Sequence, residues 1–363
     1  MLRVLEAFSG YGSQSIALRN LGIEYEVVAI SEIDKYAIKA YEAIHGPTNN
    51  LGDISKINPS DIPDHDLFTY SFPCQDLSVA GKQAGLGKGT RSGLLYECEK
   101  IIEAKKPKYL LLENVKNLVG KKFKPQFDEW LKYLEELGYT NYWKVLNAKD
   151  YEVPQNRERV FVVSILGEHK PYEFPKPIPL DKCIADILED EVEEKYYVSK
   201  EVQDKFRPNE NIKDIIDSPI RLGGLFDTDK SKHQAGSVWD IEKLSPTLDT
   251  MQGGWRQPCI IDTTNIIGKL ECKGWYDIET RVHGTDGVSP TIETRNRGKY
   301  MDNSYRIRKL TPRECFRLMG MRDDDIDKIQ ATGISNTQQY KMAGNSIVVN
   351  VLEAIFEKLF MEG

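Results

Sequence analysis

The residue with the greatest capacity for chemistry is Cys74, which follows Pro73 shortly after the apolar run 67–70. A proline beside a cysteine at the carboxyl end of a strand places the thiol on a stiff loop, over the crevice where open α/β sheets bind ligands. A single cysteine is also commonly a buried, inert thiol, so its neighbours decide between a nucleophile and a core residue.

Further polar groups stand at the ends of other apolar runs. Glu113 follows the run 109–112, which predicts a carboxyl group at the same crevice. Arg157 and Arg159 precede the run 160–165 and offer two guanidinium groups two residues apart. Taken alone, each of these residues would also be interpreted as a member of an ion pair or as a cap.

The segment 77–96 that follows Cys74 contains five glycines and no acidic residue. Its cations are Lys82, Lys88 and Arg91. Glycines loosen the backbone and cations attract polyanions, so the composition predicts a mobile cationic lid. A merely flexible surface loop is the alternative interpretation.

A nucleotide-binding loop is predicted where the first apolar run ends, in the sequence Phe8-Ser-Gly10-Tyr-Gly12. Glycines permit the tight turn and the close backbone approach that such a loop needs. The full dinucleotide fingerprint is not met, because Ser15 stands where the third glycine would be. A plain strand–helix turn is therefore the alternative.

Two acidic residues follow this loop in the chain. Glu32 stands at the end of the second apolar run, where it could bind the hydroxyl pair of a ribose. Asp53 could bind an adenine amino group. A loop or N-cap carboxylate is the alternative interpretation of each.

These residues must be positioned by the strands and helices of the first 165 residues. Five continuous apolar runs have the length of strands buried on both faces, at 2–8, 27–30, 67–70, 109–112 and 160–165. Apolar residues at helical spacing predict helices over 37–44, 127–137 and, near the end of the chain, 346–360. Strands that alternate with helices predict an open, mostly parallel α/β sheet.

The chain changes character after this region. Four prolines between 171 and 179 indicate a linker, and an acidic stretch typical of a solvated face follows it. From 221 to 308 the chain is rich in Gly, Thr, Ser, Asp and Asn. Two segments there, 236–250 and 280–294, share the ending Ser-Pro-Thr, an aliphatic residue, an acid and Thr. We interpret them as duplicated strand–loop units of one irregular β domain.

The composition limits the classes of protein to which the chain can belong. It has 363 residues, enough for about two domains, and a formal net charge of −7. No apolar run approaches the about 18 to 20 residues that a membrane span requires, and the charged first residues predict no signal peptide. The six cysteines include no C-x-x-C pair, so we expect no metal site, no disulfide framework and a reducing compartment.

The distribution of charge modifies what the net charge suggests. A total of −7 argues against a polyanionic partner, but the acidic excess lies largely in 176–217. Residues 295–317 hold eight cations, among them Arg295 and Arg297, against two acids. This segment is predicted to contact phosphates, with a solvated charged strand as the alternative.

Five spaced motifs resemble, in order, those of the bacterial and phage DNA (cytosine-5)-methyltransferase family. They are Phe8-Ser-Gly-Tyr-Gly12, Pro73-Cys74-Gln75, Glu113-Asn114-Val115, Gln155-x-Arg157-x-Arg159 and Ala343-Gly344-Asn345-Ser346. The segment 308–320 resembles the late structural motif of the family. The segment 71–78, which contains Cys74, is similar to the corresponding segment of some mycoplasma-type members. The resemblance covers about residues 1–166 and 306–360.

The resemblance implies covalent catalysis on cytosine. Cys74, as a thiolate, would attack carbon 6 of the base, and Glu113 would hold the exocyclic amine and the protonated ring N3. Arg159, with Arg157 beside it, would bond to the base carbonyl oxygen. Carbon 5 would then take a methyl group from S-adenosylmethionine, after which its proton and Cys74 would leave.

The same resemblance implies the cofactor site. The residues expected to bind S-adenosylmethionine are Phe8, Gly10, Gly12, Glu32, Ile33, Asp53, Ile54, Asn345 and Ser346. Glu32 would bind the ribose, and Asp53 with Ile54 would meet the adenine. Ile33 stands where many relatives have an aromatic residue that packs against adenine, so we expect somewhat weaker cofactor binding.

Double-stranded DNA is the implied partner, and the target base must be flipped out of the duplex. The residues expected to contact DNA are Gln75, Ser78, Lys82, Lys88, Arg91, Thr291, Arg295 and Arg297. The lid would close over the flipped base, with Ser78 near the phosphates. Thr291 resembles a threonine that the family places near the flipped base, and Thr247, in the other repeat copy, is the alternative.

The implied architecture is a Rossmann-like α/β methyltransferase domain at 1–175 plus 338–363, with a smaller, irregular β-rich target-recognition domain at 176–337. We expect a monomeric cytoplasmic enzyme, nucleoid-associated when bound to DNA. It would act beside a cognate restriction endonuclease or as an orphan, and it would have no membrane partner.

Three other hypotheses were weighed against this one. A tRNA-methylating member of the family would share the catalytic residues, but the long segment with two Ser-Pro-Thr units argues against it. A non-catalytic, sequence-specific DNA-binding protein would not need the intact catalytic positions. A dehydrogenase would not explain the convergence of Cys74, Glu113 and Arg159.

Overall fold

The computed structural model describes residues 1–73, 92–209, 218–228, 231–252, 254–262, 266–269, 281–283 and 306–362. The chain divides into two compact units. The first comprises 1–153, 157–181 and 316–363, and the second comprises 154–156 and 182–315.

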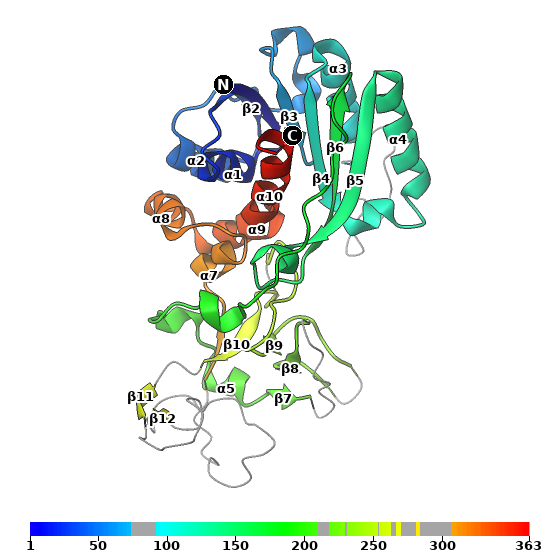
Figure 1. The fold of residues 1–363 in the computed structure, drawn as a ribbon. Helices are drawn as coiled ribbons and strands as arrows, with labels where there is room; N and C mark the ends of the chain where they lie inside the picture. The colour runs from blue at the N-terminus through cyan, green and yellow to red at the C-terminus, as the bar shows by residue number, and fades with distance from the viewer. Residues whose placement is uncertain are drawn as a thin grey trace. The chain divides into compact units, whose positions relative to one another are not determined.

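The first unit is built on a six-stranded sheet (Figure 1). Its strands are β1 (Leu2–Ala7), β2 (Tyr25–Ser31), β3 (Leu67–Tyr70), β4 (Tyr109–Val115), β5 (Tyr139–Asn147) and β6 (Glu158–Leu166). They lie in the order β2-β1-β3-β4-β6-β5. The first four of these are parallel, whereas β6 runs antiparallel to both β4 and β5. The predicted mostly parallel α/β sheet is confirmed.

Five of the six strands coincide with the predicted apolar runs, and β5 is the strand that the sequence analysis missed. It lies at the edge of the sheet, and its residues Trp143 and Lys144 are exposed. Because an edge strand buries only part of its surface, its sequence mixes polar and apolar residues and shows no continuous apolar run.

Helices cover both faces of this sheet. They are α1 (Ser13–Asn20), α2 (Lys35–His45), α3 (Leu95–Lys105), α4 (Lys124–Glu136), α8 (Asp323–Ala331), α9 (Asn336–Asn345) and α10 (Val349–Phe360). Short 3-10 helices occur at Ile54–Lys56, Pro59–Asp61, Ser92–Leu94, Lys116–Val119 and Ala148–Tyr151. Figure 1 shows α10 beside α1, and a hydrogen bond of 2.6 Å from Asn20 to Glu353 joins the two helices.

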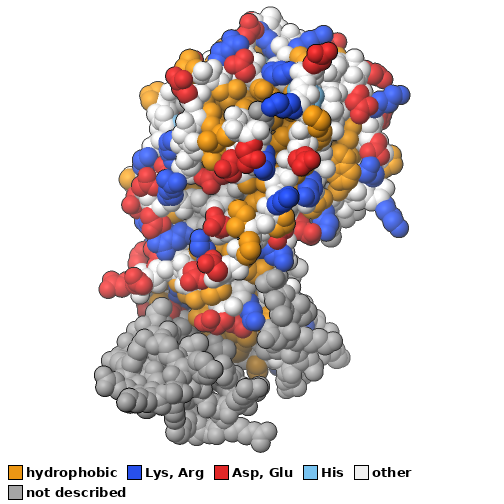
Figure 2. Space-filling view, in the orientation of Figure 1, with side chains coloured by type: hydrophobic (Ala, Val, Ile, Leu, Met, Phe, Trp, Pro, Cys, Tyr) orange, Lys and Arg blue, Asp and Glu red, His pale blue; other side chains and the backbone are white. Residues whose placement is uncertain are grey.

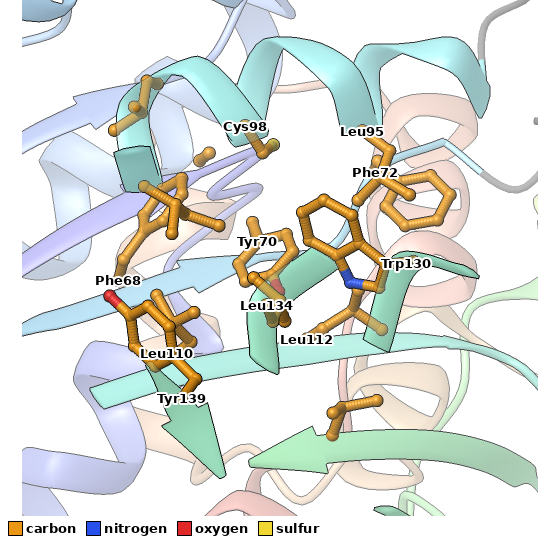
Figure 3. Close-up of a cluster of buried hydrophobic side chains, with 14 of the residues drawn as sticks. Phe68, Tyr70, Phe72, Leu95, Cys98, Leu110, Leu112, Trp130, Leu134 and Tyr139 are labelled. Atoms are coloured by element: carbon orange, nitrogen blue, oxygen red, sulfur yellow. The ribbon is translucent and has the colours of Figure 1, made fainter. Parts of the chain in front are cut away.

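The main hydrophobic core lies between the sheet and the helices α3 and α4 (Figure 3). The rings of Phe68 and Tyr70 stack with their centroids 5.1 Å apart, and Tyr70 meets Trp130 of α4 edge-on at 6.3 Å. Full burial of one such side chain contributes about 1.5–3 kcal/mol. The core therefore holds β3 firmly, and the chain leaves β3 towards the segment that contains Cys74.

The second unit is smaller and consists mainly of short strands. Its five-stranded sheet has the order β13 (Arg306–Lys309), β10 (Cys259–Asp262), β9 (Ser237–Trp239), β8 (Arg221–Gly224) and β7 (Arg207–Pro208). A separate antiparallel pair is formed by β11 (Ile266–Lys269) and β12 (Arg281–His283). Its other elements are α5 (Lys200–Gln203) and 3-10 helices at Ile184–Ile187 and Glu194–Tyr196, while α7 (Pro312–Arg317) crosses the division. This is the irregular β-rich unit that the sequence predicted.

The division between the units falls at other residues than the predicted domain boundaries. The sequence analysis assigns 316–337 to the second domain, whereas the structure includes these residues in the first unit. Asp325 of α8 is fully buried and pairs with Arg19 of α1, and the ring of Phe316 meets that of Tyr11 edge-on at 5.7 Å. Contacts between such distant segments leave no mark in local composition, from which the boundary was predicted.

A buried ion network organises the last strand of the second unit. Arg308 on β13 is fully buried, and its two terminal nitrogens each donate to a carboxylate oxygen of Glu314 at 2.8 Å. Its Nε donates to Asp262 on β10 at 3.1 Å. Glu314 also accepts the backbone N–H of Thr311 at 2.7 Å, and Asp262 accepts the hydroxyl of Tyr197. Every charge in this network has a partner, which its burial requires.

The prediction that 295–317 contacts phosphates is wrong for Arg308, because this side chain is buried. Three other cations of the segment pair with acids, namely Arg306 with Glu194, Arg313 with Glu189 and Arg317 with Asp323. The count of charges within 295–317 overstates the positive charge of this part of the surface, because most of the acids that pair with its cations lie in other segments. Figure 2 shows acidic and basic side chains interspersed over the described residues of the face in view.

We predict that Glu314→Ala lowers the free energy of unfolding by about 3–5 kcal/mol, because it leaves the buried charge of Arg308 without its main partner. Glu194→Ala is the matched control: it removes the exposed partner of Arg306 and is expected to cost less than about 1 kcal/mol. Urea denaturation followed by tryptophan fluorescence measures both. Equal effects of the two substitutions would contradict a structural role for the network.

Candidate active site

A pocket of about 390 Å³ lies in the first unit at the carboxyl ends of the parallel strands β1 to β4. The loops that follow these strands line it together with the segment 341–347. β1 has β2 on one side and β3 on the other, so the chain winds in opposite directions from this point, which is where open sheets bind ligands. The pocket collects the predicted site residues Phe8, Gly10, Glu32, Ile33, Asp53, Ile54, Glu113, Arg157, Arg159, Asn345 and Ser346.

The loop after β1 has the backbone of a close-approach turn. Phe8, Gly10 and Gly12 all have positive φ angles, of 56°, 58° and 84°. At Gly12 a Cβ atom would lie only 2.5 Å from Nε2 of His45, so glycine is required there both for conformation and for space. Gly12 stands just before α1 and behind the pocket wall, whereas Phe8 and Gly10 face the pocket.

The side chain of Glu32 forms hydrogen bonds with the loop after β1 and with the loop after β2. One carboxylate oxygen accepts the backbone N–H of Gly10 at 3.0 Å, and the other accepts those of Ile33 and Asp34 at 2.8 Å each. The carboxylate is therefore held in one orientation at the pocket wall. Asp53 lines the pocket too, and it also caps the 3-10 helix that follows it by accepting from Ser55.

The far side of the pocket carries an acid paired with a guanidinium group. Glu113 lies near the end of β4 and Arg159 near the start of β6, and the antiparallel pairing of these strands brings Nε of Arg159 to 3.2 Å from the carboxylate of Glu113. Burial raises the pKa of Glu113, and the positive charge of Arg159 offsets this only in part. The side chain of Asn114 donates to the carbonyl of Phe72 at 3.0 Å, which fixes the segment before Cys74.

Arg157 does not join this pair, although it stands two residues before Arg159. Its buried guanidinium donates to the backbone carbonyls of Gly344 and Ser346, at 2.9 and 2.8 Å. The sequence analysis predicted a group beside Arg159 at the base, and the structure shows a contact with the turn after α9 instead.

Several residues that line the pocket were not predicted, among them Tyr11, Asp34 and Lys341. Tyr11 donates its hydroxyl proton to Ser346 at 2.8 Å, and Lys341 pairs with Asp34 at 2.6 Å. Tyr11 stands inside the glycine loop, so its position was a signal, but neither interaction could be inferred without knowing where 341–347 returns.

Nine predicted residues lie outside the residues that the structure describes. These are Cys74, Gln75, Ser78, Lys82, Lys88, Arg91, Thr291, Arg295 and Arg297. Thr247, the alternative to Thr291, is described, and its hydroxyl donates to the carbonyl of Asn156 at 2.5 Å.

In the described part of the chain, no helix is long and apolar enough to cross a membrane. Among the same residues, no group of three or more His, Cys, Asp or Glu side chains could hold a metal ion.

A glycine loop at the switch point of an open sheet, a fixed carboxylate on the next strand and a buried acid–guanidinium pair are typical of an α/β enzyme with a nucleotide-like cofactor. Residues 2–361 match the family model of the C-5 cytosine-specific DNA methylases. The chain belongs to this family, and it is therefore a methyltransferase.

Similar proteins agree with this assignment over nearly their full length. The chain is 37% identical to the type II methyltransferase M2.ScrFI of Lactococcus lactis subsp. cremoris, with 99% of each covered. It is 35% identical to the orphan methyltransferase M.SPBetaI of Bacillus phage SPbeta, with 99% of this chain and 97% of that protein covered. The fold resembles that of the S. pombe Dnmt2 methyltransferase, with a TM-score of 0.66, 20% identity, and 100% and 99% of the two chains covered.

The departure from the glycine fingerprint at Ser15 has a structural explanation. Glu6 on β1 is fully buried beneath the loop, and one of its carboxyl oxygens accepts the hydroxyl of Ser15 at 2.7 Å. The hydroxyls of Ser15 and Tyr41 lie 3.4 Å apart. Burial raises the pKa of Glu6 to about 7, so the protonated form is favoured beneath the cofactor loop.

We predict that Glu6→Gln removes a pH dependence of stability. Because the pKa of Glu6 rises from 4.5 to about 7 on folding, its contribution is complete below pH 4.5 and is lost as the pH rises through 7. Over this window the free energy of unfolding of the wild type should fall by about 1.4 kcal/mol per pH unit relative to the variant. Urea denaturation from pH 4.5 to 8.5 measures the difference.

The control for this experiment is Glu136→Gln, a change at an exposed carboxylate on α4. Its stability curve should run parallel to that of the wild type. If the Glu6→Gln curve does the same, Glu6 does not titrate in this window.

Proposed function

We propose that this protein is a DNA cytosine-5 methyltransferase, which flips a cytosine out of duplex DNA and transfers a methyl group from S-adenosylmethionine to carbon 5. The observation that carries the proposal is the buried pair of Glu113 and Arg159, which lines the same pocket as the glycine loop and Pro73. Cys74 follows Pro73 in the chain, so one site would hold a nucleophile, an acid and an oxygen-binding guanidinium group.

The residues of the pocket fit S-adenosylmethionine. A volume of about 390 Å³ is within the range of small-molecule sites, and the fixed Glu32 carboxylate suits a ribose hydroxyl pair. Phe8 and Gly10 would form the wall near the amino-acid part, with Gly12 behind it, and Ile33, Asp53 and Ile54 would surround the adenine. Asn345 and Ser346 would close the pocket. When bound, the sulfonium group supplies an electrophilic methyl group.

The chain's own residues would make the base reactive. Carbon 5 of cytosine is a poor nucleophile, so the Cys74 thiolate would first form a bond to carbon 6. The electron pair of the 5,6 double bond would be drawn towards N3, which Glu113 would protonate. Burial raises the pKa of Glu113, which is the direction that transfer of a proton to N3 requires. Arg159 would hold the carbonyl oxygen and so distinguish cytosine from bases without it.

The reaction would end by restoring the double bond. Once carbon 5 carries the methyl group, loss of its proton would return an electron pair to the ring. The bond from carbon 6 to the Cys74 sulfur would then break, which releases 5-methylcytosine and the thiolate. Enclosure of the base would keep water from the adduct during these steps.

DNA binding is proposed from the sequence and from the relatives. Gln75, Ser78, Lys82, Lys88 and Arg91 would form a lid over the flipped base, and Thr291 or Thr247 would lie near that base. Arg295 and Arg297 would contact phosphates. The second unit would recognise the target sequence, within the predicted domain 176–337.

The cellular setting is proposed on the same basis. Relatives named both as type II and as orphan methyltransferases support action with or without a cognate restriction endonuclease. The enzyme would be a cytoplasmic monomer that joins the nucleoid when bound to DNA.

We predict that the purified protein transfers labelled methyl groups from S-adenosylmethionine to duplex DNA and not to tRNA. Cys74→Ser should abolish transfer, whereas Cys183→Ser, which changes a partly exposed thiol of the second unit, should retain it. The wild type should also form an SDS-stable adduct with DNA that contains 5-fluorocytosine, because carbon 5 then carries fluorine in place of the proton whose loss would release the thiolate. Incorporation into tRNA alone would refute the DNA assignment, and an active enzyme without the adduct would refute the covalent route.

We predict that Ile33→Trp tightens cofactor binding. The side chain of Ile33 is 73% exposed at the pocket wall, so a larger ring can be added there without disturbing the core. Stacking of a base on an aromatic ring is worth about 1–3 kcal/mol, which corresponds to a decrease of at least about fivefold in the Kd for S-adenosylmethionine. Isothermal titration calorimetry measures the Kd, with Ile178→Trp, at an exposed isoleucine outside the pocket, as the control. An unchanged Kd for Ile33→Trp would place the adenine elsewhere.

A further inference from the structure

A buried group of hydrogen bonds joins the glycine loop to the turn that links α9 and α10. The hydroxyl of Tyr11 donates to Oγ of Ser346 at 2.8 Å, and Ser346 donates in turn to the carbonyl of Ala343 at 3.0 Å. Arg157 donates to the carbonyls of Gly344 and Ser346 at 2.9 and 2.8 Å. The turn 344–346 is thus held by two side chains, one from the residue just before β6 and one from the loop after β1.

Packing holds the side chain of Tyr11 in one orientation. The residue is 1% exposed, and its ring packs edge-on against Phe316 with the centroids 5.7 Å apart. The glycine fingerprint requires glycines at positions 10 and 12 but sets no requirement for the side chain between them. A tyrosine there is therefore a feature of this chain's own sequence, and its hydroxyl bonds to a wall of the pocket rather than to solvent.

Arg157 donates to two backbone carbonyl groups of this turn. It is 3% exposed, and its backbone N–H donates to the side chain of Asn147 at 2.9 Å, which anchors the residue at the end of β5. A planar guanidinium group can donate to both carbonyls at once, whereas a lysine ammonium would be a single point of contact on a flexible stem.

We propose that Tyr11 and Arg157 are positioning residues, which fix the turn 344–346 and thereby set the affinity of the pocket for its cofactor. This inference rests on the proposed function. The reason is geometric: Gly344, Asn345 and Ser346 line the pocket opposite the glycine loop, so a shift of the turn changes the width of the pocket. Small displacements of binding groups are enough to weaken binding. The base-side pair of Glu113 and Arg159 makes no contact with the turn through these bonds, so the chemical step is affected less.

The test is a double-mutant cycle on Tyr11→Phe and Ser346→Ala, with the Kd for S-adenosylmethionine and the kcat on duplex DNA as readouts. Tyr11→Phe keeps the ring and its packing, and we expect a three- to tenfold increase in Kd with kcat within twofold of the wild type. Because Tyr11 acts through Ser346, the double variant should bind no more weakly than Ser346→Ala alone. Independent, additive losses would overturn the proposed route.

Tyr139→Phe is the matched control for the hydroxyl. Tyr139 is buried in the same unit and donates to the carbonyl of Pro107 at 2.8 Å, but it does not line the pocket. It should lower the melting temperature about as much as Tyr11→Phe does and leave the Kd unchanged. If both variants change the Kd equally, or if neither does, the role of Tyr11 is only structural and the inference is wrong.

Lysine substitutions separate positioning from catalysis at the two arginines. Arg157→Lys should raise the KM for S-adenosylmethionine with little change in kcat, whereas Arg159→Lys should lower kcat. If Arg157→Lys lowers kcat and leaves KM unchanged, Arg157 acts in the chemical step and the positioning role is wrong. The proposed function and this inference are contradicted by different results. A wild type that binds no S-adenosylmethionine overturns both of them. An unchanged Kd in Tyr11→Phe overturns the inference alone.

Discussion

The antiparallel pairing of β6 with β4 is the constraint on which the active site depends. In a parallel sheet, only the carboxyl ends of strands reach the edge where ligands bind. Because β6 runs in the opposite direction, its amino-terminal end reaches that edge, with Arg159 opposite Val115 in the register. The guanidinium group of Arg159 can then meet the carboxyl group of Glu113, which lies near the end of β4. A parallel strand in this position would carry the arginines to the other edge of the sheet, away from the glycine loop.

At the same edge of the sheet, burial changes the pKa of two carboxyl groups. Glu113 and Glu6 are both removed from water, and burial raises the pKa of each. Glu113 faces the pocket, where the positive charge of Arg159 opposes the shift that burial causes in its pKa. Glu6 lies beneath the glycine loop and bonds to Ser15, so its neutral form supports the start of α1. The environment, rather than the residue type, separates a group suited to proton transfer from one suited to holding a loop.

Sequence patterns predicted the features that depend on local packing. Strands buried on both faces appear as apolar runs, and the glycine loop appears as its motif, so most of the sheet and much of the pocket could be placed in advance. The edge strand β5 was missed because it is only partly buried. Arg308 was assigned to phosphate because it stands near other cations, and Arg157 was placed beside the base by its motif, yet both are buried and contact distant segments. Local sequence carries no record of such partners.

The order of segments along the chain keeps the residues that line the pocket outside the second unit. Most of the second unit is one continuous stretch, 182–315, between β6 and the segment 316–363 that belongs again to the first unit. The pocket takes residues from both sides of this stretch, and the bond between Tyr11 and Ser346 joins them directly. A change within 182–315 alters neither partner of that bond. Substitutions within 182–315 can therefore leave this bond intact, whereas a substitution at Tyr11 or Ser346 removes it directly.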